Sequence, residues 1–433
     1  MHPFRRRRRR AGVALLITVC GGLASGLAGP SGARAAVPCQ STALSQASSP
    51  RSCWAPFSSG SAFTTRLSSN PPLAADNSAV QQHMADYGWT FGSGSPGFSI
   101  GASDGTRPVF YASPSDPTMT IHCTSSEGRG TCQGANGIDI NGATINVPAG
   151  ARPEHNWDAH MTVIETATGA EYDLWRASVS GSTITAGTGA ETNVDTGSGT
   201  GGGGDAANLP LSAGLLRPAD LMAGHIDHAL VVVVPCTNAT GADVGYTWPA
   251  TGGWGQYCGQ YWNERASTAP ELGQLMRLDM TSAQIAASGA PQWEQTIMTA
   301  LTRYGAYIED TQGSWHNEGI YILTQSSSSW TDLGQTDQWA TAARVFGQRG
   351  DDLDSNVSIP TGRLELVDTC VPERTCADNG SPAKESVNLH KRRHRSPRTR
   401  LRASRPGTAS SRRGLHDGVR RHARRSERRL RPS

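Results

Sequence analysis

Two segments of the sequence place histidines and acids where they could transfer protons or bind a metal. In AGHIDHALVVVVPC, residues 223–236, two histidines and an aspartate precede four consecutive valines. In HMTVIETATGAEYDLWRA, residues 160–177, a histidine, acids and a tryptophan alternate with apolar residues. An imidazole with a carboxylate can move a proton, and an indole ring can stack on a sugar. The two segments therefore suggest chemistry on a carbohydrate.

The second segment has the pattern of a β-hairpin with its turn at TATG. A four-residue turn pairs Thr162 with Asp173 and His160 with Trp175, which puts these four side chains on one face and apolar side chains on the other. A five-residue turn shifts the register by one residue and scatters the polar face, so we prefer the shorter turn. His160 and Asp173 are then candidate catalytic residues, and Trp175 is a candidate for stacking on substrate. The alternative is an exposed sheet face with an ordinary cross-strand pair.

The histidines before the valine run allow three interpretations. His225, Asp227 and His228 have donor types that suit zinc or a similar ion, but the alternation of a strand turns His228 away from the other two. A divalent metal could therefore be held through His225 and Asp227. His228 is a third catalytic candidate if it enters the sheet beside His160 or Asp173. The structural alternative is a buried histidine that donates to a backbone carbonyl.

Two further side chains are candidate substrate-binding residues. Arg277, in the strand-like LMRLDM, could bind a uronate carboxylate, or it could simply pair with Asp279 or another acid. Tyr304 follows the strongest helical pattern of the chain, shortly before Asp310. No sequence spacing marks a glycosidase carboxylate pair, because the fold sets that distance. The sequence contains no HExxH or Walker motif, which argues against the enzymes that those motifs define.

A mainly β fold must position these residues. Short alternating runs between turn residues predict a disulfide-stapled β-sandwich of the jelly-roll or concanavalin-like type with a few packed helices. The runs are PVFYA, MTIHC, ATINV, HMTVIE, EYDLWRA, STITA, ALVVVV, LMRL and IYILTQ. Apolar spacing predicts helices over 77–87 and 291–307. We expect a flexible loop over 196–208, where TGSGTGGGGDAAN is followed by no phosphate-loop lysine.

The N-terminus and the cysteines predict export. Residues 1–36 combine arginines, an apolar segment and a small-residue cleavage site, which is the pattern of a signal peptide; a membrane anchor is the alternative. The eight remaining cysteines fall into four sequence-local pairs, and no CxxC pair indicates a zinc site. The predicted disulfides are Cys39–Cys53, Cys123–Cys132, Cys236–Cys258 and Cys370–Cys376.

Composition divides the rest of the chain into a single β-rich domain over 37–376, with an irregular arm over 37–75, and a tail over 377–433. Residues 37–390 have 15 Lys and Arg against 34 Asp and Glu. We expect such an acidic body to be monomeric, to repel nucleic acid and to leave the membrane after signal cleavage. The basic tail is expected to be disordered. It is either an electrostatic tether or the product of a shifted reading frame.

Four blocks in order, PFSSGSAF, HMTVIETATGAEYDLW, AGHIDHAL and TALTRYGAY, resemble a family of secreted actinobacterial β-rich proteins, over roughly residues 53–346. The resemblance implies export and a single domain, and it does not include the basic tail. It implies no particular reaction.

These observations favour an extracellular protein that acts on polysaccharide or cell-wall glycan, as a lyase or as a glycoside hydrolase. His160, His228 and Asp173 would transfer protons, and Trp175, Arg277 and Tyr304 would bind the substrate. The alternative is a non-catalytic glycan-binding or cell-envelope protein with the same polar face. A metal-dependent hydrolase is a third hypothesis, and the sequence predicts no other cofactor.

Overall fold

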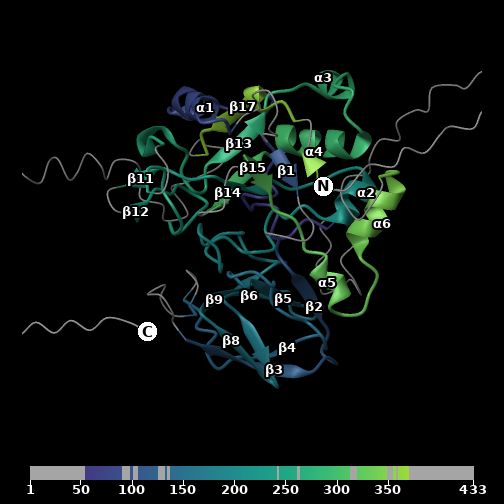
Figure 1. Cartoon of the computed structure of the whole chain (residues 1–433). Coiled ribbons are helices and arrows are strands. Elements are labelled where there is room, and N and C mark those ends of the chain that lie inside the picture. The colour runs from purple at the N-terminus through teal and green to yellow at the C-terminus, as the bar shows by residue number, and fades with distance from the viewer. Residues whose placement is uncertain are drawn as a thin grey trace, which may run out of the picture. The chain divides into compact units, whose positions relative to one another are not determined.

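The computed structural model describes residues 54–89, 98–100, 106–124, 132–133, 137–240, 243–260, 264–312, 319–348, 355–356 and 359–369. This part of the chain is mainly β, with several sheets and a few helices (Figure 1). The β-rich class predicted from the alternating runs is therefore confirmed. The predicted signal peptide, the first part of the predicted arm and the basic tail lie outside the described residues.

The largest sheet is mixed and has seven strands in the order β16-β1-β15-β10-β14-β13-β17. The bounds are β1 Phe98–Ile100, β10 Leu230–Val234, β13 Leu275–Leu278, β14 Ala306–Thr311, β15 Ile320–Ile322, β16 Ser355–Asn356 and β17 Leu364–Val367. Strands β10 and β14 are parallel, as are β1 and β15, and the other neighbours are antiparallel. The valine strand β10 thus has a partner on each side.

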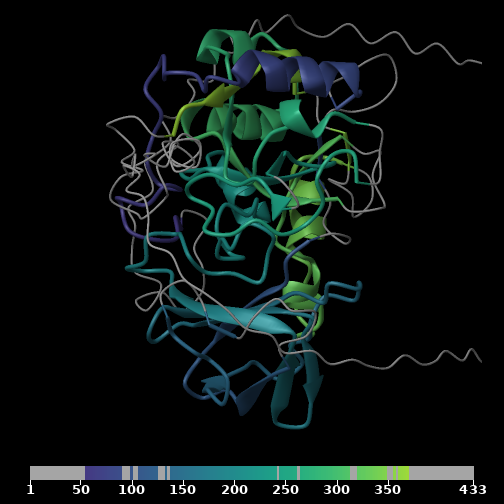
Figure 2. The same ribbon diagram turned by 90° about the vertical axis from the view of Figure 1, so that its left-hand side faces the viewer.

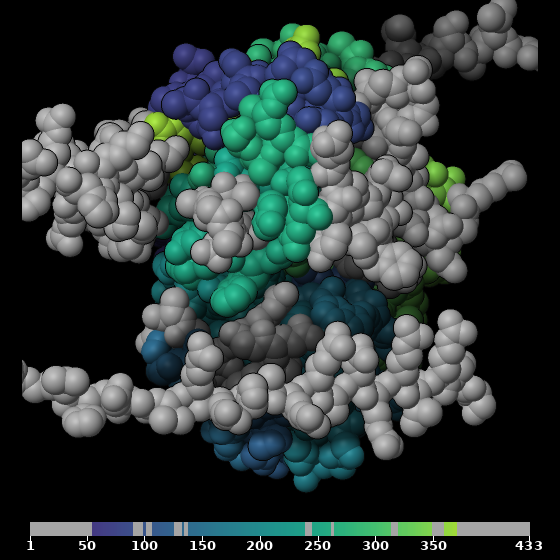
Figure 3. Space-filling view, turned by 60° about the vertical axis from the view of Figure 1, so that its left-hand side comes forward, coloured from purple at the N-terminus to yellow at the C-terminus, as the bar shows by residue number. Residues whose placement is uncertain are grey.

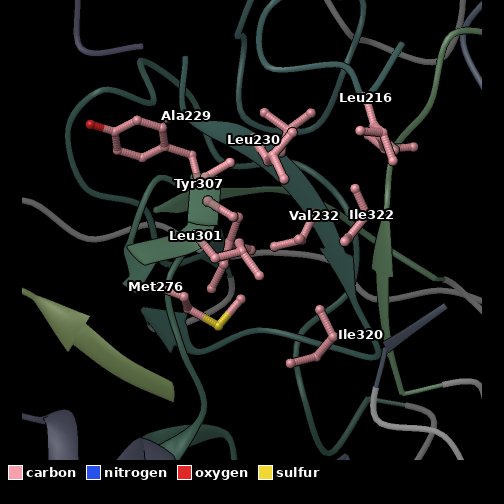
Figure 4. Packing of buried hydrophobic residues seen from close by; sticks show 14 of the residues in the cluster. Leu216, Ala229, Leu230, Val232, Met276, Leu301, Tyr307, Ile320 and Ile322 are labelled. Atoms are coloured by element: carbon pink, nitrogen blue, oxygen red, sulfur yellow. The ribbon is translucent and has the colours of Figure 1, made fainter. Parts of the chain in front are cut away.

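The valine strand is buried on both faces, as its run of β-branched residues predicts. Figure 4 shows Val232 surrounded by side chains from neighbouring elements, including Ile322 of β15, Met276 of β13 and Leu301. All four side chains are at most 1% exposed. Burying an aliphatic side chain of this size stabilises a fold by about 1.5–3 kcal/mol, so this cluster anchors the sheet.

Helices pack beside this sheet. They are α1 Asn77–Asp86, α2 Pro218–Ala223, α3 Ser282–Ala286, α4 Gln292–Arg303, α5 Ser328–Thr331 and α6 Gln338–Val345, with 3-10 turns η3 Ala266–Thr268 and η5 Thr361–Arg363. Helix α1 contacts β17 and α4 contacts β13 (Figure 2). The predicted apolar stripe of α4 is buried, but the helix ends at Arg303 rather than at 307. It ends there because Gly305 adopts a φ of 79° and the chain turns into β14.

There are also two four-stranded sheets, and the first of them contains the hairpin predicted from the sequence. One has the order β2-β5-β6-β9 and the other β4-β3-β8-β7. The bounds are β2 Val109–Ala112, β3 Thr118–Cys123, β4 Thr144–Asn146, β5 Met161–Glu165, β6 Ala170–Trp175, β7 Ser178–Ser180, β8 Thr183–Ala186 and β9 Thr188–Asn193. Their apolar side chains form a second hydrophobic cluster, distinct from the one around β10. A short ribbon joins β11 Ala239–Thr240 to β12 Asp243–Val244.

The structure does not confirm the more specific jelly-roll or concanavalin-like sandwich. A jelly roll is built from antiparallel strands. Here four neighbouring pairs run parallel, namely β1–β15, β2–β5, β3–β8 and β10–β14. The alternating pattern thus predicted the strands, but it did not predict these parallel pairings.

Two of the predicted disulfides fall on the described residues, and both are present, Cys123–Cys132 and Cys236–Cys258. The predicted pairs Cys39–Cys53 and Cys370–Cys376 lie outside the described residues. Among the described helices, none is long and apolar enough to cross a membrane.

Candidate active site

The β5–β6 hairpin has the predicted register. Thr162 pairs with Asp173, so His160, Thr162, Asp173 and Trp175 share one face of the sheet. All four side chains are buried. The alternative of an exposed sheet face is therefore wrong, because the irregular segment 204–212 covers the polar face.

Two acids of β6 hold the covering segment in place. Asp173 accepts hydrogen bonds from Thr162 Oγ1 at 2.8 Å and from the backbone nitrogen of Leu211 at 2.9 Å. Glu171 accepts from the backbone nitrogen and the hydroxyl of Ser212 at 2.9 and 2.7 Å. Burial raises the pKa of both carboxyl groups, and Glu171 raises that of Asp173 further. The surroundings of Asp173 are thus those of a group that positions backbone.

The glycine run of the predicted flexible loop packs closely on these strands. A Cβ on Gly204 would lie 3.1 Å from the backbone nitrogen of Trp175, and a Cβ on Gly202 would lie 2.7 Å from Thr192 Cγ2. The carbonyl of Gly204 accepts a hydrogen bond from His160 Nε2 at 3.1 Å. Glycine suits these positions because it lets the backbone approach the strand directly.

A β-bulge in β14 brings two neighbouring acids to the same place. The pairing of β10 with β14 skips Glu309, which is the extra residue of the bulge. In a regular strand, Glu309 and Asp310 would point to opposite faces. Here both approach Arg107, whose Nη2 lies 3.8 Å from Glu309 Oε1 and 3.5 Å from Asp310 Oδ2.

Glu309 and Asp205 form a buried carboxyl pair, 0% and 5% exposed. Neither Glu309 oxygen, nor Oδ2 of Asp205, accepts a hydrogen bond from a donor of the described residues. Burial raises the pKa of Glu309 to about 7, although Arg107 opposes the shift. Burial and the neighbouring Glu309 raise the pKa of Asp205 well above its ordinary value. One proton held between the two groups would satisfy both.

Asp310 lies next to this pair and interacts with Asp158; both are partly exposed, and the Asp310 side chain is 22% exposed. Asp158 accepts a hydrogen bond from Trp175 Nε1 at 3.0 Å. The pKa of Asp310 is raised, first by burial and then by the charge of Asp158, against the effect of Arg107. We call this group the carboxyl cluster: Glu154, Asp158, Asp205, Glu309 and Asp310, with Arg107 and His160.

His160 links the carboxyl cluster to a surface pocket. Its Nε2 donates to the carbonyl of Gly204, which leaves Nδ1 facing Glu154 Oε2 at 3.4 Å. The other Glu154 oxygen accepts from the backbone nitrogen of Thr106 at 3.0 Å. Glu154 also lines a pocket of about 550 Å³ between residues 150–155 and 177–179. Pocket and cluster therefore meet at Glu154.

An exposed tryptophan lies beside the carboxyl cluster. Trp175, the predicted stacking residue, is 2% exposed, whereas Trp157 is 67% exposed. The two rings meet edge to face at 5.9 Å, and the Arg176 guanidinium lies 3.5 Å from the centre of the Trp157 ring. Arg176 and Ala159 have φ angles of 51° and 45°. Such strained residues cluster at functional sites.

The structure does not place His228 beside His160 or Asp173. His228 Nδ1 donates to the backbone carbonyl of the next residue at 2.9 Å. Its Nε2 lies 3.4 Å from Arg217 Nη2 and 3.7 Å from Asp220 Oδ2. This is the arrangement of the structural alternative, so the expected meeting of the two histidines is wrong.

Tyr304 joins His225 and Asp227 in a separate polar group. His225 Nδ1 lies 3.0 Å from Asp227 Oδ2. The Tyr304 hydroxyl accepts from Arg66 Nε at 2.9 Å and lies 3.5 Å from Asp227 Oδ1. Burial raises the pKa of Tyr304, which Arg66 opposes. The predicted metal ligands thus meet an arginine and a phenol instead of a third metal donor, and their role in metal binding stays a prediction.

Arg277 is engaged by acids of its own sheet. Its Nη2 lies 2.6 Å from Glu365 Oε2 and 3.7 Å from Asp279 Oδ1. Glu365 belongs to β17, the edge strand that pairs with β13. Arg277 therefore pairs with acids, as one of the two interpretations expected, and its role in substrate binding stays a prediction.

A different set of metal donors converges on one point. His83, Cys236, Cys258 and Glu264 have ligand atoms that all lie within 4.8 Å of one another. No other group of three or more such donors occurs among the described residues. These four residues could hold a metal ion once the Cys236–Cys258 disulfide is reduced, and no motif in the sequence connects them.

Five residues of the carboxyl cluster were not predicted from the sequence: Arg107, Glu154, Asp158, Asp205 and Glu309. For Glu309 a signal was present, because the acids of AYIEDT end a buried strand that runs parallel to the valine strand. Sites often form at the carboxyl ends of parallel strands. Arg107, Glu154 and Asp205 lie in irregular segments, where no periodicity places a side chain.

Fold and site together define a mainly β protein with a buried carboxyl cluster beside an exposed aromatic side chain. No family model, no curated protein and no solved structure matches the chain. Its function is therefore argued from the geometry of the site.

Proposed function

We propose that the protein is a secreted glycoside hydrolase that cleaves a neutral polysaccharide or cell-wall glycan at the carboxyl cluster. One observation carries the proposal. Two partly exposed carboxyl groups, Asp158 and Asp310, interact with each other, and Asp310 lies next to Glu309, a buried acid with a pKa of about 7. Glycosidases use such a pair, one to protonate the leaving oxygen and one as base or nucleophile.

The surroundings assign the roles. Asp310 has a raised pKa and partial exposure, which suits the acid that protonates the glycosidic oxygen. Asp158 accepts a hydrogen bond from the Trp175 indole, which orients this carboxyl group for the role of base or nucleophile. Glu309 and Asp205 hold a proton behind Asp310, and Arg107 limits the negative charge of the group.

In this scheme His160 and Asp173 position other groups and do not contact the substrate. His160 connects Gly204 of the covering segment with Glu154, so it positions the cluster and can exchange a proton with Glu154. Asp173 holds Leu211 and thereby the segment itself. His228 has no part in the scheme.

Hydrolysis is favoured over lyase chemistry by charge. A lyase must neutralise the carboxylate of a uronate, for which an accessible cation is needed. Arg107, the guanidinium of the carboxyl cluster, is 4% exposed and lies against two acids, and Arg277 is bound by Glu365. The exposed Arg152 lies at the adjacent pocket and not in the cluster. A cluster dominated by carboxyl groups repels an anionic sugar and accepts a neutral one.

Trp157 and the adjacent pocket supply a binding surface. The exposed indole offers an apolar face to a pyranose, and Arg176 holds that ring in place from one side. The pocket at Glu154 is large enough for part of a saccharide chain.

Export is part of the proposal. Disulfides persist in oxidising compartments, and the two that the structure contains support that setting. The signal peptide, the monomeric state, the sandwich-type architecture and membership of the actinobacterial family stay predictions of the sequence.

The test is to incubate the full chain with neutral and uronate-containing polysaccharides, and to follow reducing ends and the absorbance of unsaturated sugars. We expect reducing ends from a neutral glycan and no unsaturated product. Asp310→Asn and Asp158→Asn should each lower the rate by about 100-fold or more. Asp86→Asn, at an exposed acid of α1, is the matched control and should retain the rate.

An unsaturated product would instead establish a lyase. If no glycan is cleaved although the protein is folded, hydrolysis is ruled out for that panel and the non-catalytic alternative becomes the better one. Glycan binding by the wild type that is lost in Trp157→Ala would then identify a binding protein that uses the same surface.

A further inference from the structure

We propose that His83, Glu264 and the cysteine pair Cys236–Cys258 form a redox-gated zinc site. While the cysteines are joined as a disulfide the site is closed, and once they are reduced it binds one zinc ion. His83 lies in α1, Cys236 follows β10, and Glu264 precedes η3. Helix α1 contacts η3, and Figure 3 shows the blue-violet surface of α1 adjoining green surface from later in the chain.

The facing atoms of the four residues are all acceptors. His83 Nε2 lies 3.3 Å from Glu264 Oε2 and 3.7 Å from Cys258 Sγ. Cys236 Sγ lies 3.2 Å from the same carboxylate oxygen. A disulfide sulfur carries no hydrogen, and a carboxylate oxygen only accepts. A proton on His83 Nε2 would satisfy Glu264 alone, whereas a metal cation could bind all four groups once the cysteines are reduced.

The second nitrogen of His83 fixes which atom faces the cysteines. Thr268 Oγ1 donates its one hydrogen to the carbonyl of Arg265 at 3.1 Å. It must therefore accept from His83 Nδ1, which lies 3.0 Å away. In the neutral imidazole, the lone pair then resides on Nε2 and points at the cysteine pair. Metal-binding histidines are oriented by such a hydrogen bond from the other ring nitrogen.

The donor set and its burial suit zinc. Two thiolates, an imidazole and a carboxylate are zinc ligands, and in a tetrahedral site with Zn–S of about 2.3 Å two sulfurs lie about 3.8 Å apart. The four ligand atoms already lie within 4.8 Å of one another. Cys236 and Cys258 are at most 1% exposed and the Glu264 side chain is 14% exposed, so an ion would enter past Glu264.

The other disulfide has no such surroundings. Cys123 and Cys132 belong to no group of convergent metal donors among the described residues. It therefore provides an internal control, because reduction opens both disulfides and only one of them gains a histidine and a carboxylate.

A phosphine can reduce the Cys236–Cys258 disulfide. The disulfide takes up two electrons and two protons and gives two thiols, while the phosphine is oxidised to its oxide with oxygen from water. Zinc then displaces the two thiol protons and binds both thiolates, His83 Nε2 and Glu264. After the zinc is chelated, exchange with an added small-molecule disulfide, which takes up the two electrons and two protons, restores the disulfide of the protein.

The experiment titrates the full chain with Zn²⁺ before and after phosphine reduction, and measures bound metal by elemental analysis after gel filtration. We expect no tightly bound zinc in the oxidised protein and one ion per chain in the reduced protein. Cobalt should give a thiolate-to-metal charge-transfer band and the d–d bands of a tetrahedral site. Near-ultraviolet circular dichroism verifies that the reduced protein is folded.

Variants separate this site from adventitious binding. Cys123→Ser with Cys132→Ser should still bind one zinc ion after reduction, whereas Cys236→Ser with Cys258→Ser should bind none. Glu264→Gln, at the partly exposed ligand, should raise the Kd for zinc at least about 10-fold. The proposal is overturned if the folded, reduced chain binds no zinc, or if binding survives loss of Cys236 and Cys258.

Discussion

Glu309 is held in surroundings that oppose its negative charge. It is fully buried, and the guanidinium of Arg107 lies 3.8 Å away, beyond the distance of a good charge-assisted hydrogen bond. Burial therefore outweighs the attraction, and the pKa rises to about 7. A carboxyl group that keeps its proton near neutral pH can supply it to a neighbouring acid such as Asp310.

Glu309→Gln should change how stability depends on pH. Folded Glu309 binds its proton more tightly than unfolded Glu309, so the wild type loses stability as pH rises from its ordinary pKa of 4.5 to about 7. The shift corresponds to roughly 3 kcal/mol, which glutamine does not contribute. Urea unfolding between pH 5 and 8 measures the difference. Parallel pH profiles for the two proteins would contradict the assignment.

Ala159→Gly should stabilise the protein by up to about 1 kcal/mol, because Ala159 has a φ of 45° and glycine adopts this conformation without strain. The matched control is Ala177→Gly, at a neighbouring position without a positive φ, which should destabilise by about 0.5–1 kcal/mol. Thermal unfolding compares the two. Equal losses of stability would show that Ala159 is not strained.

At the scale of elements, the site depends on a segment that is neither helix nor strand. Residues 204–212 cover the polar face of the hairpin through hydrogen bonds from Leu211 and Ser212 to the acids of β6. The same segment carries Asp205 and accepts the hydrogen bond of His160. The packing of one irregular segment thus brings the sheet, His160 and the carboxyl pair together.

Gly204→Ala should therefore destabilise by about 1–3 kcal/mol, because the new Cβ would lie 3.1 Å from the backbone nitrogen of Trp175. Gly362→Ala is the control, since a Cβ there meets nothing within 4 Å. It should change stability by no more than about 1 kcal/mol. Denaturant titration of both variants provides the comparison. If Gly204→Ala left the free energy of unfolding unchanged, the segment could move away from the sheet without destabilising the protein.

The sequence allowed the hairpin to be predicted to the residue. Only one register puts apolar side chains together on one face, so Thr162 opposite Asp173 followed from periodicity alone. The valine strand and the stripe of α4 were predictable for the same reason. The segment that buries the polar face could not be predicted, because its residues show no periodic pattern. Its glycines suggest a flexible loop, whereas in the structure they allow close packing.

Two features of the site escaped prediction for a different reason. The bulge at Glu309 changes where a side chain points without changing the residues of the strand. The separation of His228 from His160 depends on tertiary structure. His160 directly precedes β5 and His228 lies just before β10, and these two strands belong to different sheets. Neither is encoded in a local pattern.

At the scale of the whole molecule, buried acids set the response to pH. Glu171, Asp173, Asp205, Glu309 and Asp310 all have raised pKa values, chiefly through burial. Asp220 is the opposite case, because Arg217 lowers its pKa in spite of burial. The five acids with raised pKa values lie in β6 and in the carboxyl cluster, and together they outweigh the single opposite contribution of Asp220.

The Tm should therefore be higher near pH 5 than near pH 8. Each acid with a raised pKa holds its proton in the native state over an interval where the unfolded chain has released it, so stability falls as pH rises through that interval. The contribution of Asp220 is lost only as pH falls through its lowered pKa, below about 4. Calorimetry across this range is the measurement. A Tm that rises steadily towards pH 8 would refute it.

The bulge in β14 also has a consequence for how the chain could change over generations. Val232 pairs with Ile308 and Val233 with Asp310, so removal of Glu309 would leave both pairs in place. A deletion of one codon would then preserve the ladder of the sheet and discard the buried acid. The hydrogen bonding of the strand does not require this residue. The loss of a single residue could therefore separate the scaffold of the sheet from its buried acid.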